Sequence, residues 1–304
     1  MTGDTDLAAL GAVLAERART RILLALGDGR ALAASVLAAE AGVAPSTASA
    51  HLARLVEAGL LGVTVQGRHR YYRLAGPEVA EAMEALARVA PPAPVRSLRD
   101  GTRAHAVRAA RTCYDHLAGR LGVALFGALL ADGSVTGGDG RHRLDRDGRD
   151  RLSAHGRDVD YRLTAAGAER LGRLGVEIGP VGRDGLPLRY CVDWSEQAHH
   201  LSGAVGRALA GRLIELGWLR RADRGRALHV TDAGRRGLGG EFGLADPTRG
   251  GHDDRTTQGG AGAPDAGGEG RGLPRLLVSS GRRVRPGSGP RARTPRRGRA
   301  APRP

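Results

Sequence analysis

The 304-residue sequence has only two cysteines, and it contains no lysine and no asparagine. The scarcity of cysteine, together with the lack of a signal peptide, leads us to expect a cytoplasmic protein whose thiols are reduced. No apolar run approaches the roughly 18 residues that a membrane span needs, so we expect no membrane segment. The sequence also lacks the glycine-rich motifs that bind nucleotide phosphates, the G-x-S-x-G motif of serine hydrolases and the H-E-x-x-H motif of zinc proteases. We therefore predict that the protein is not an enzyme.

The absence of lysine makes arginine the source of all basic charge, and this bias is typical of a gene from a GC-rich genome. The formal net charge is +15, but residues 245–304 hold 13 arginines against 5 acidic residues. Residues 1–90 hold 9 arginines and 9 acidic residues, so this part is neutral. An argument for nucleic-acid binding must therefore rest on a local cluster of arginines rather than on net charge.

Residues 31–75 carry the pattern of a helix, a tight turn, a second helix and a β-hairpin. We expect the first helix at residues 33–41, with three residues facing inward, Val36, Leu37 and Ala41. Gly42 suits the end of that helix, because glycine adopts the left-handed conformation at little cost.

The second helix is expected at residues 45–58, where Pro45 suits the first position. Strands at residues 61–66 and 68–74 follow. This order predicts a winged helix-turn-helix, in which the second helix enters the DNA major groove. Successive residues of a helix are about 100° apart around its axis, and this spacing gives the second helix one apolar face and one polar face. The polar face and the hairpin supply our candidate DNA contacts, which are Ser46, Thr47, Ser49, His51, Arg54, Arg68 and Arg70. Arg73 adds to the basic cluster on the hairpin.

The run V-x-P-S-T-x-S-x-H-L-x-x-L-x-x-A-G-L, followed by G-R-H-R-Y-Y-R-L, resembles the ArsR/SmtB family of bacterial winged-helix repressors. The resemblance covers about residues 6–89. It implies a homodimer that binds double-stranded DNA, with a recognition helix at residues 45–58 and a wing at residues 61–74. It also implies that the first helix, at residues 6–16, and a helix at residues 77–89 form the dimer interface, the latter with Val79, Met83 and Leu86 on one side. Ala44 departs from the family, which usually has a hydroxyl residue at this helix cap.

The region after the stiff linker at residues 91–96 contains an internal repeat. The segment from His116 matches the segment from His200 at an offset of 84 residues, and each copy continues to a helix that we expect a threonine to cap, Thr164 or Thr231. Each copy predicts a helix, a short strand, a loop, a strand and a second helix. We expect the loop of the first copy, residues 136–160, to be exposed and mobile.

The repeat places similar polar residues in each copy: Cys113, Asp115 and His116 in the first, and Cys191, Asp193 and His199 or His200 in the second. If the copies pair about a pseudo-twofold axis, Cys113, His116, Cys191 and His200 are candidate ligands for zinc or another thiophilic metal. The alternative is a purely structural role for these residues. In that case the two thiols belong to the hydrophobic core, Asp115 and Asp193 cap helices, and Arg111 and Arg189 form ion pairs with these aspartates. A pocket for a small-molecule effector, lined by Tyr190 and Trp194, is a further alternative.

We therefore predict a mainly α-helical chain with small β-hairpin wings, in which a second, internally repeated, winged-helix-like α+β domain follows the winged helix-turn-helix. The predicted divisions are a DNA-binding and dimerisation domain at 1–90, a linker at 91–96, a regulatory domain at 97–240 and a disordered Arg/Gly/Pro-rich tail at 241–304. The expected function is an effector-responsive transcriptional repressor that needs no resident cofactor. The alternatives are a winged-helix scaffold for protein partners and a metal- or thiol-responsive sensor that uses Cys113 and Cys191.

Overall fold

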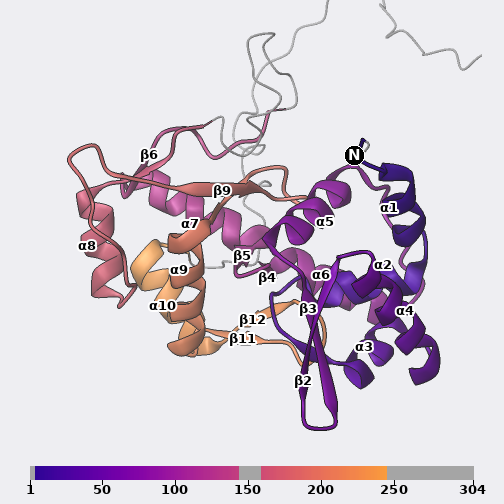
Figure 1. The fold of residues 1–304 in the computed structure, drawn as a ribbon. Helices are drawn as coiled ribbons and strands as arrows, with labels where there is room; N and C mark the ends of the chain where they lie inside the picture. The colour runs from indigo at the N-terminus through magenta and orange to yellow at the C-terminus, as the bar shows by residue number, and fades with distance from the viewer. Residues whose placement is uncertain (1–3, 144–158, 245–304) are drawn as a thin grey trace, which may run out of the picture. The chain divides into compact units, whose positions relative to one another are not determined.

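A computed structural model describes residues 4–143 and 159–244 (Figure 1). The N-terminal part begins with two helices, α1 (Leu7–Leu14) and α2 (Arg17–Ala25), and continues through a short strand, β1 (Leu32–Ala33), into α3 (Ala34–Ala41). The tight turn after α3 leads into α4 (Pro45–Glu57), the hairpin β2 (Leu61–Gln66) and β3 (His69–Leu74), and then α5 (Pro77–Val89). This is the element order of a winged helix-turn-helix, as the sequence predicted.

Helix α4 has the boundaries that its sequence dictates to within one residue. Pro45 occupies its first turn, and Ala44 offers no side-chain hydrogen bond to the helix N-terminus. The buried face consists of Ala48, Leu52 and Leu55, and the two leucines pack into the N-terminal core. Gly42, at φ 72°, provides the left-handed residue that ends α3 and allows the tight turn.

The wing is an antiparallel hairpin that β1 extends to three strands in the order β1-β3-β2. Leu61 pairs with Leu74 at the base of the hairpin, and Gln66 pairs with His69 at its tip. Gly67, which has a positive φ, lies in the turn between these last two residues. Leu61, Tyr72 and Leu74 are buried, whereas the outer half of the hairpin is exposed. The hairpin base therefore belongs to the core and its tip projects from it.

One apolar residue does not lie where the sequence predicted. Val36 was expected to face inward, but 40% of it is exposed. The reason is that α3 contacts α2 and α4 through Leu37, Ala38 and Ala41, and Val36 is about 100° away from Leu37 around the helix axis. On α5, Val79 and Met83 pack against the core, whereas Leu86 is 46% exposed.

The remaining described residues form helices with small antiparallel sheets. In chain order they are α6 (Leu98–Ala109), β4 (Arg111–Cys113), β5 (His116–Ala118), α7 (Gly119–Ala131), β6 (Val135–Thr136), β7 (Arg162–Leu163), α8 (Ala165–Arg173), β8 (Leu186–Pro187), β9 (Arg189–Val192), β10 (His199–Ser202), α9 (Gly203–Glu215), β11 (Leu219–Arg221), β12 (Leu228–Val230) and α10 (Asp232–Phe242). The sheets are the pairs β4-β5, β9-β10 and β11-β12 and the three-stranded β6-β7-β8. Thr164 and Thr231 cap α8 and α10 through their hydroxyl groups, as predicted.

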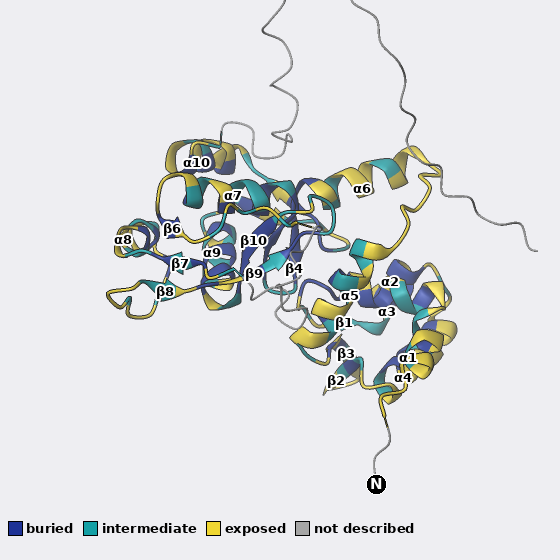
Figure 2. Ribbon diagram, turned by 90° about the horizontal axis from the view of Figure 1, so that it is seen from above, coloured by how far each residue is buried: buried dark blue, intermediate teal, exposed yellow. Residues whose placement is uncertain are grey.

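The core of this second part lies between α7, α9 and the short strands. Leu121, Leu125, Phe126 and Leu129 from α7 meet Leu209 and Leu213 from α9. The hairpin strands β4, β5 and β10 are buried throughout, and β10 appears dark blue in Figure 2. Consequently any polar side chain on these three strands is removed from water.

Two of the sequence predictions fall wholly or largely outside the described residues. The tail predicted at 241–304 is described only as far as residue 244, and the loop predicted at 136–160 is not described between 144 and 158. Within the described ranges, no helix is long and apolar enough to cross a membrane.

Candidate DNA interface and a cysteine–histidine cluster

The polar face of α4 is open to solvent. Ser46, Thr47, Ser49 and Arg54 are exposed, and His51 is half-buried. The Ser49 hydroxyl donates a 3.0 Å hydrogen bond to the Pro45 carbonyl, and Arg54 forms a 2.8 Å ion pair with Glu57. Both ion-pair partners are well exposed, so this contact is a weak one that DNA phosphate could replace.

The wing places its arginines beyond the end of the core. Arg68 and Arg70 are exposed, and Arg68 Nε lies 3.5 Å from His69 Nε2. The neighbouring Val63 and Val65 are also exposed, so the outer wing is not packed against other described residues. The predicted contact residues thus lie on exposed surfaces of two elements, a helix and a hairpin tip.

A second group of polar residues lies at the two buried hairpins β4-β5 and β9-β10. Within each hairpin, a cysteine and a histidine are directly opposite each other across the strands: Cys113 faces His116, and Cys191 faces His200. The hairpins contact each other, and one potential ligand atom from each of the four side chains lies within 4.8 Å of the other three. The structure therefore brings together all four residues that the sequence singled out as candidate ligands.

The turn between β4 and β5 contributes to this arrangement. It consists of only two residues, Tyr114 and Asp115, and Tyr114 has a φ of 57°, a conformation that a non-glycine residue adopts at a cost. The Tyr114 amide donates a 2.7 Å hydrogen bond to the Gly27 carbonyl, which helps to hold it there. The short turn fixes Cys113 and His116 as a cross-strand pair.

Two glycines allow the hairpins to approach the helices. A Cβ atom at Gly122 on α7 would lie 2.6 Å from the Leu117 carbonyl oxygen and 3.6 Å from the Cβ of His200. At the corresponding place on α9, a Cβ atom at Gly206 would lie 2.7 Å from the Leu201 carbonyl oxygen and 3.3 Å from the Cβ of His116. Glycine is therefore required at both places, because a Cβ atom would collide with the backbone carbonyl groups of Leu117 and Leu201.

The four side chains are shielded from water to different degrees. Cys113, His116 and His200 are buried, and Cys191 is half-buried. The two imidazole rings stack with their centroids 5.2 Å apart. His116 Nδ1 lies 3.2 Å from Asp115 Oδ1, but His116 Nε2 and both ring nitrogens of His200 have no hydrogen-bond partner among the described residues. Buried polar atoms without a partner are uncommon and costly.

The electrostatics of the cluster favour one thiolate. The pKa of Cys191 is lowered because the neighbouring Cys113 thiol and the His116 imidazole stabilise its charged form. The pKa of Cys113 is raised well above its usual value, since Cys191 and burial both disfavour a second thiolate. Burial lowers the pKa of His200 to about 4, which keeps this imidazole neutral at pH 7.

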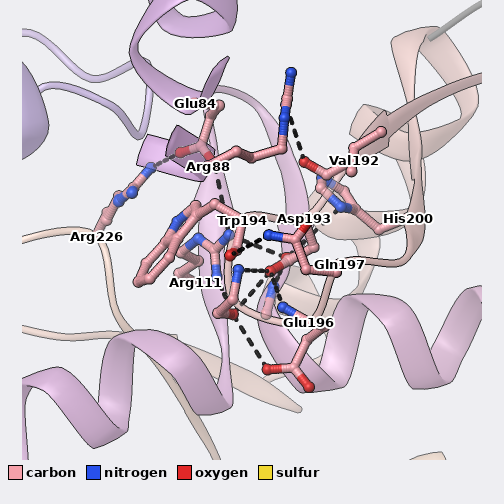
Figure 3. A network of polar contacts seen from close by, with 12 residues as sticks. Glu84, Arg88, Arg111, Val192, Asp193, Trp194, Glu196, Gln197, His200 and Arg226 are labelled. Carbon is pink, nitrogen blue, oxygen red and sulfur yellow. Dashed lines mark hydrogen bonds and ion pairs between the residues drawn. The ribbon is translucent and has the colours of Figure 1, made fainter. Parts of the chain in front are cut away.

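A buried ionic network connects the cluster to α5 (Figure 3). Asp193 Oδ2 lies 3.7 Å from His200 Nδ1 and 3.0 Å from Arg111 Nη2, and Arg111 is fully buried. Arg111 Nη2 also lies 3.5 Å from Glu84 Oε2 on α5, and Glu84 forms a second ion pair with Arg226. Asp193 accepts a further hydrogen bond, 2.7 Å long, from the Gly119 amide at the start of α7.

The acidic groups in this network are held in their charged forms. Burial raises the pKa of Glu84, but Arg226 and Arg111 outweigh burial and the pKa is lowered overall. Burial likewise raises the pKa of Asp193, but the charge of Arg111 and the hydrogen bonds from Ser195 and Gly119 outweigh burial and lower that pKa overall. The indole ring of Trp194 covers the Arg111 guanidinium, which lies 4.8 Å from the ring centroid. Trp194 therefore packs on the network.

The sequence did not indicate Glu84 and Arg226 as functional residues. Glu84 lies on an amphipathic helix among other glutamates, and Arg226 is one of several arginines in a polar turn, so no local signal distinguished them. Their pairing depends on contacts between segments far apart in the chain. The expected pairing of Arg111 with an aspartate does occur, and its partner is Asp193.

A groove of about 950 Å³ lies between α5 and the two hairpins. Its wall includes Glu84 and Arg88 from α5, Cys113 and His116 from β4-β5, and Cys191 from β9. Tyr190, which the sequence suggested as a pocket residue, also lines it. The groove gives the cysteine–histidine cluster a route to solvent.

Comparisons with known proteins concern both parts of the chain. A family model described as a helix-turn-helix domain matches residues 14–64. The HTH-type transcriptional regulator YdfF of Bacillus subtilis (strain 168) is 37% identical over 233 residues, which cover 76% of this chain and 95% of that protein. The match is far longer than a winged helix-turn-helix, so this relative also has sequence similar to the region that follows it.

Other relatives match a smaller share of the chain. The HTH-type transcriptional regulator CmtR of Mycobacterium tuberculosis (strain ATCC 25618 / H37Rv) is 41% identical over 86 residues, 28% of this chain and 72% of that protein. The solution structure of a homodimeric winged helix-turn-helix DNA-binding domain from Mycobacterium bovis, described as a possible ArsR-family transcriptional regulator, is 34% identical and covers 29% of this chain and 88% of that one, with a TM-score of 0.25. This chain belongs to the HTH-type transcriptional regulators, and its N-terminal region holds their helix-turn-helix domain, here followed by a wing.

Proposed function

We propose that the protein is a cytoplasmic, effector-responsive repressor that binds a specific operator as a homodimer. The observation that carries the proposal is the exposed polar surface on α4 and the wing, formed by Ser46, Thr47, Ser49, Arg54, Arg68 and Arg70, with His51 at its edge. Hydroxyl groups at the start of such a helix and an arginine in its last turn suit base edges and phosphates, and arginines on a wing suit the neighbouring backbone.

Exposed apolar residues on α1 and α5 support the homodimer. Leu7 is 70% exposed, Val89 is 81% exposed, and Leu86 lies one turn from Val89. The ArsR resemblance assigns α1 and α5 to the dimer interface, and a partner subunit would bury these side chains. Two recognition helices related by a twofold axis would then read an imperfect palindrome.

We further propose that residues 97–240 form a regulatory domain with a duplicated structure, joined by residues 91–96 to a DNA-binding domain at residues 1–90. The reciprocal contacts of Gly122 with His200 and of Gly206 with His116 support a pseudo-twofold relation between the copies. The network from Asp193 through Arg111 to Glu84 gives the regulatory domain a direct contact with α5. A signal bound there could change the spacing of the two recognition helices.

The test is binding of the purified full chain to its own upstream intergenic DNA and to random DNA over a series of salt concentrations. We expect tighter binding to the upstream DNA and weaker binding by Arg54→Ala and Arg68→Ala. Each phosphate contact contributes about 0.9 to the slope of log affinity against log salt, so a substitution repeated in both subunits should lower that slope by about 2.

The matched control is Arg235→Ala, which removes an exposed arginine from α10, paired only within its own helix. This variant should bind the upstream DNA as the wild type does. Equal binding to both DNAs, unchanged by Arg54→Ala and Arg68→Ala, would contradict the proposal. That result would instead favour a winged-helix scaffold for protein partners.

A further inference from the structure

We infer that Cys113, His116, Cys191 and His200 form a tetrahedral site for one divalent cation of the zinc and cadmium class. Two thiolates and two imidazoles are a donor set that such ions prefer, and they bind it with four-coordinate geometry. The site lies on the buried hairpins after α6, not on the helices of the winged helix-turn-helix. The proposal concerns metal binding itself and does not depend on DNA binding.

The spacing of the donor atoms fits this geometry after a small closure. Bond lengths of 2.3 Å to sulfur and 2.0–2.1 Å to nitrogen place the ligand atoms of a tetrahedral zinc site about 3.3–3.8 Å apart. The four donor atoms here lie within 4.8 Å of one another. Rotation of the side chains, together with a slight approach of the two hairpins, would bring the donors to bonding distance of a central ion.

The hydrogen bonding of the histidines is that of metal ligands. His116 Nδ1 faces the Asp115 carboxylate, so in the neutral ring Nδ1 carries the proton and Nε2 carries the lone pair, and Nε2 is buried with no hydrogen-bond partner among the described residues. Histidine ligands commonly donate their second ring nitrogen to a carboxylate in this way. Both ring nitrogens of His200 are buried and have no hydrogen bond within the described part of the chain, and the carboxylate of Asp193 lies 3.7 Å from its Nδ1.

A metal ion would also remove the cost of this unliganded arrangement. Two stacked imidazoles and two thiols are buried together here, in a place where apolar side chains would pack without unpaired polar atoms. An ion bonded to all four side chains would take one donor atom from each, and Asp193, 3.7 Å from His200 Nδ1, is the nearest group for the second nitrogen of that ring. The half-buried Cys191 and the groove beside it provide the route by which an ion can enter.

The ion would link two hairpins that are distant in the sequence. Each hairpin supplies one cysteine and one histidine from paired positions, so neither can complete the site alone. Binding would therefore stabilise the packing of β4-β5 against β9-β10, which the contacts of β5 with β10 already provide in part.

The experiment is a titration of the reduced, metal-free full chain with Co²⁺, which reports its ligands by absorption. We expect one equivalent per chain, with the intense visible bands of tetrahedral Co²⁺ and a near-ultraviolet thiolate-to-metal band, all of which Zn²⁺ then abolishes. Cys191→Ser should reduce the thiolate band by about half and weaken Zn²⁺ binding at least 100-fold. Because Cys191 is half-buried, the serine variant should fold, and circular dichroism of the metal-free protein checks this.

The matched control is His105→Asn, which changes an exposed histidine on α6 and should leave the titration unaltered. A rise in unfolding temperature on addition of Zn²⁺ is expected for the wild type and for His105→Asn, but not for Cys191→Ser. Weak octahedral Co²⁺ spectra, or tight Co²⁺ binding that Cys191→Ser and His116→Gln leave unchanged, would overturn the proposal. These readouts do not involve DNA, so loss of the metal site and failure of the repressor proposal would be distinguished.

Discussion

Substitution of Glu84 by glutamine should destabilise the protein strongly, because its carboxylate is the counter-charge for two buried arginines. The side chain of Glu84 is 7% exposed, that of Arg226 8% and that of Arg111 0%. Removal of one partner from a buried ion pair costs about 3–5 kcal/mol, since the other charge is left without compensation. The glutamine oxygen can still accept one hydrogen bond, so we expect a loss of about 3 kcal/mol.

Urea unfolding at one fixed protein concentration measures this loss. With a slope of about 3 kcal/mol per molar, the unfolding midpoint should fall by about 1 M. The concentration must be fixed because the stability of a dimer depends on it. The double variant Glu84→Leu and Arg226→Leu removes both charges of one pair and leaves Arg111 paired with Asp193. The double variant should lose much less stability than the sum of the losses measured for Glu84→Leu alone and Arg226→Leu alone.

The contribution of Glu84 to the free energy of unfolding should decrease as the pH falls. The pKa of Glu84 is lower in the folded protein than in the unfolded chain. Its stabilising contribution is therefore fully present above the unfolded pKa, about 4.3, and is lost as pH falls through the folded pKa. The stability difference between wild type and Glu84→Gln should shrink at acid pH. A loss below about 1 kcal/mol at pH 7, or strict additivity in the double variant, would refute the reasoning.

Three further predictions concern the recognition helix and the metal site. Ala44→Ser should stabilise the protein by about 1 kcal/mol, because Ala44 gives α4 no side-chain cap; thermal or urea unfolding measures this, and Ala44→Val should give no gain. Asp115→Asn should weaken Zn²⁺ binding about 10–100-fold in a competition with a chromophoric chelator, because the carboxylate orients His116; unchanged affinity would exclude that role. Saturation with Zn²⁺ should change operator affinity about 5–150-fold in a fluorescence-anisotropy assay, and Cys191→Ser should show no such change. If metal binds but operator affinity stays constant, the site stabilises the fold without regulating DNA binding.

Local sequence patterns were sufficient for the winged helix-turn-helix. Pro45 and Gly42 define the start of α4 and the end of α3 by their own backbone preferences, and the apolar spacing of Ala48, Leu52 and Leu55 defines the buried face of α4. The threonine caps of α8 and α10 were predictable for the same reason, since a cap requires only residues within one helical turn. The pattern was less informative for Val36, because an apolar residue at the edge of a helix face becomes buried only if a neighbour covers it.

The sequence by itself identified Cys113, His116, Cys191 and His200 as related pairs, but only the tertiary structure decided that they converge. Within each hairpin, strand pairing places cysteine opposite histidine, and the turn between them governs this locally. The meeting of the two hairpins depends on how α7 and α9 pack and on the space left by Gly122 and Gly206. The ion pairs of Glu84 with Arg111 and Arg226 likewise had no local signal, because Coulomb interactions depend on distance in space and not along the chain.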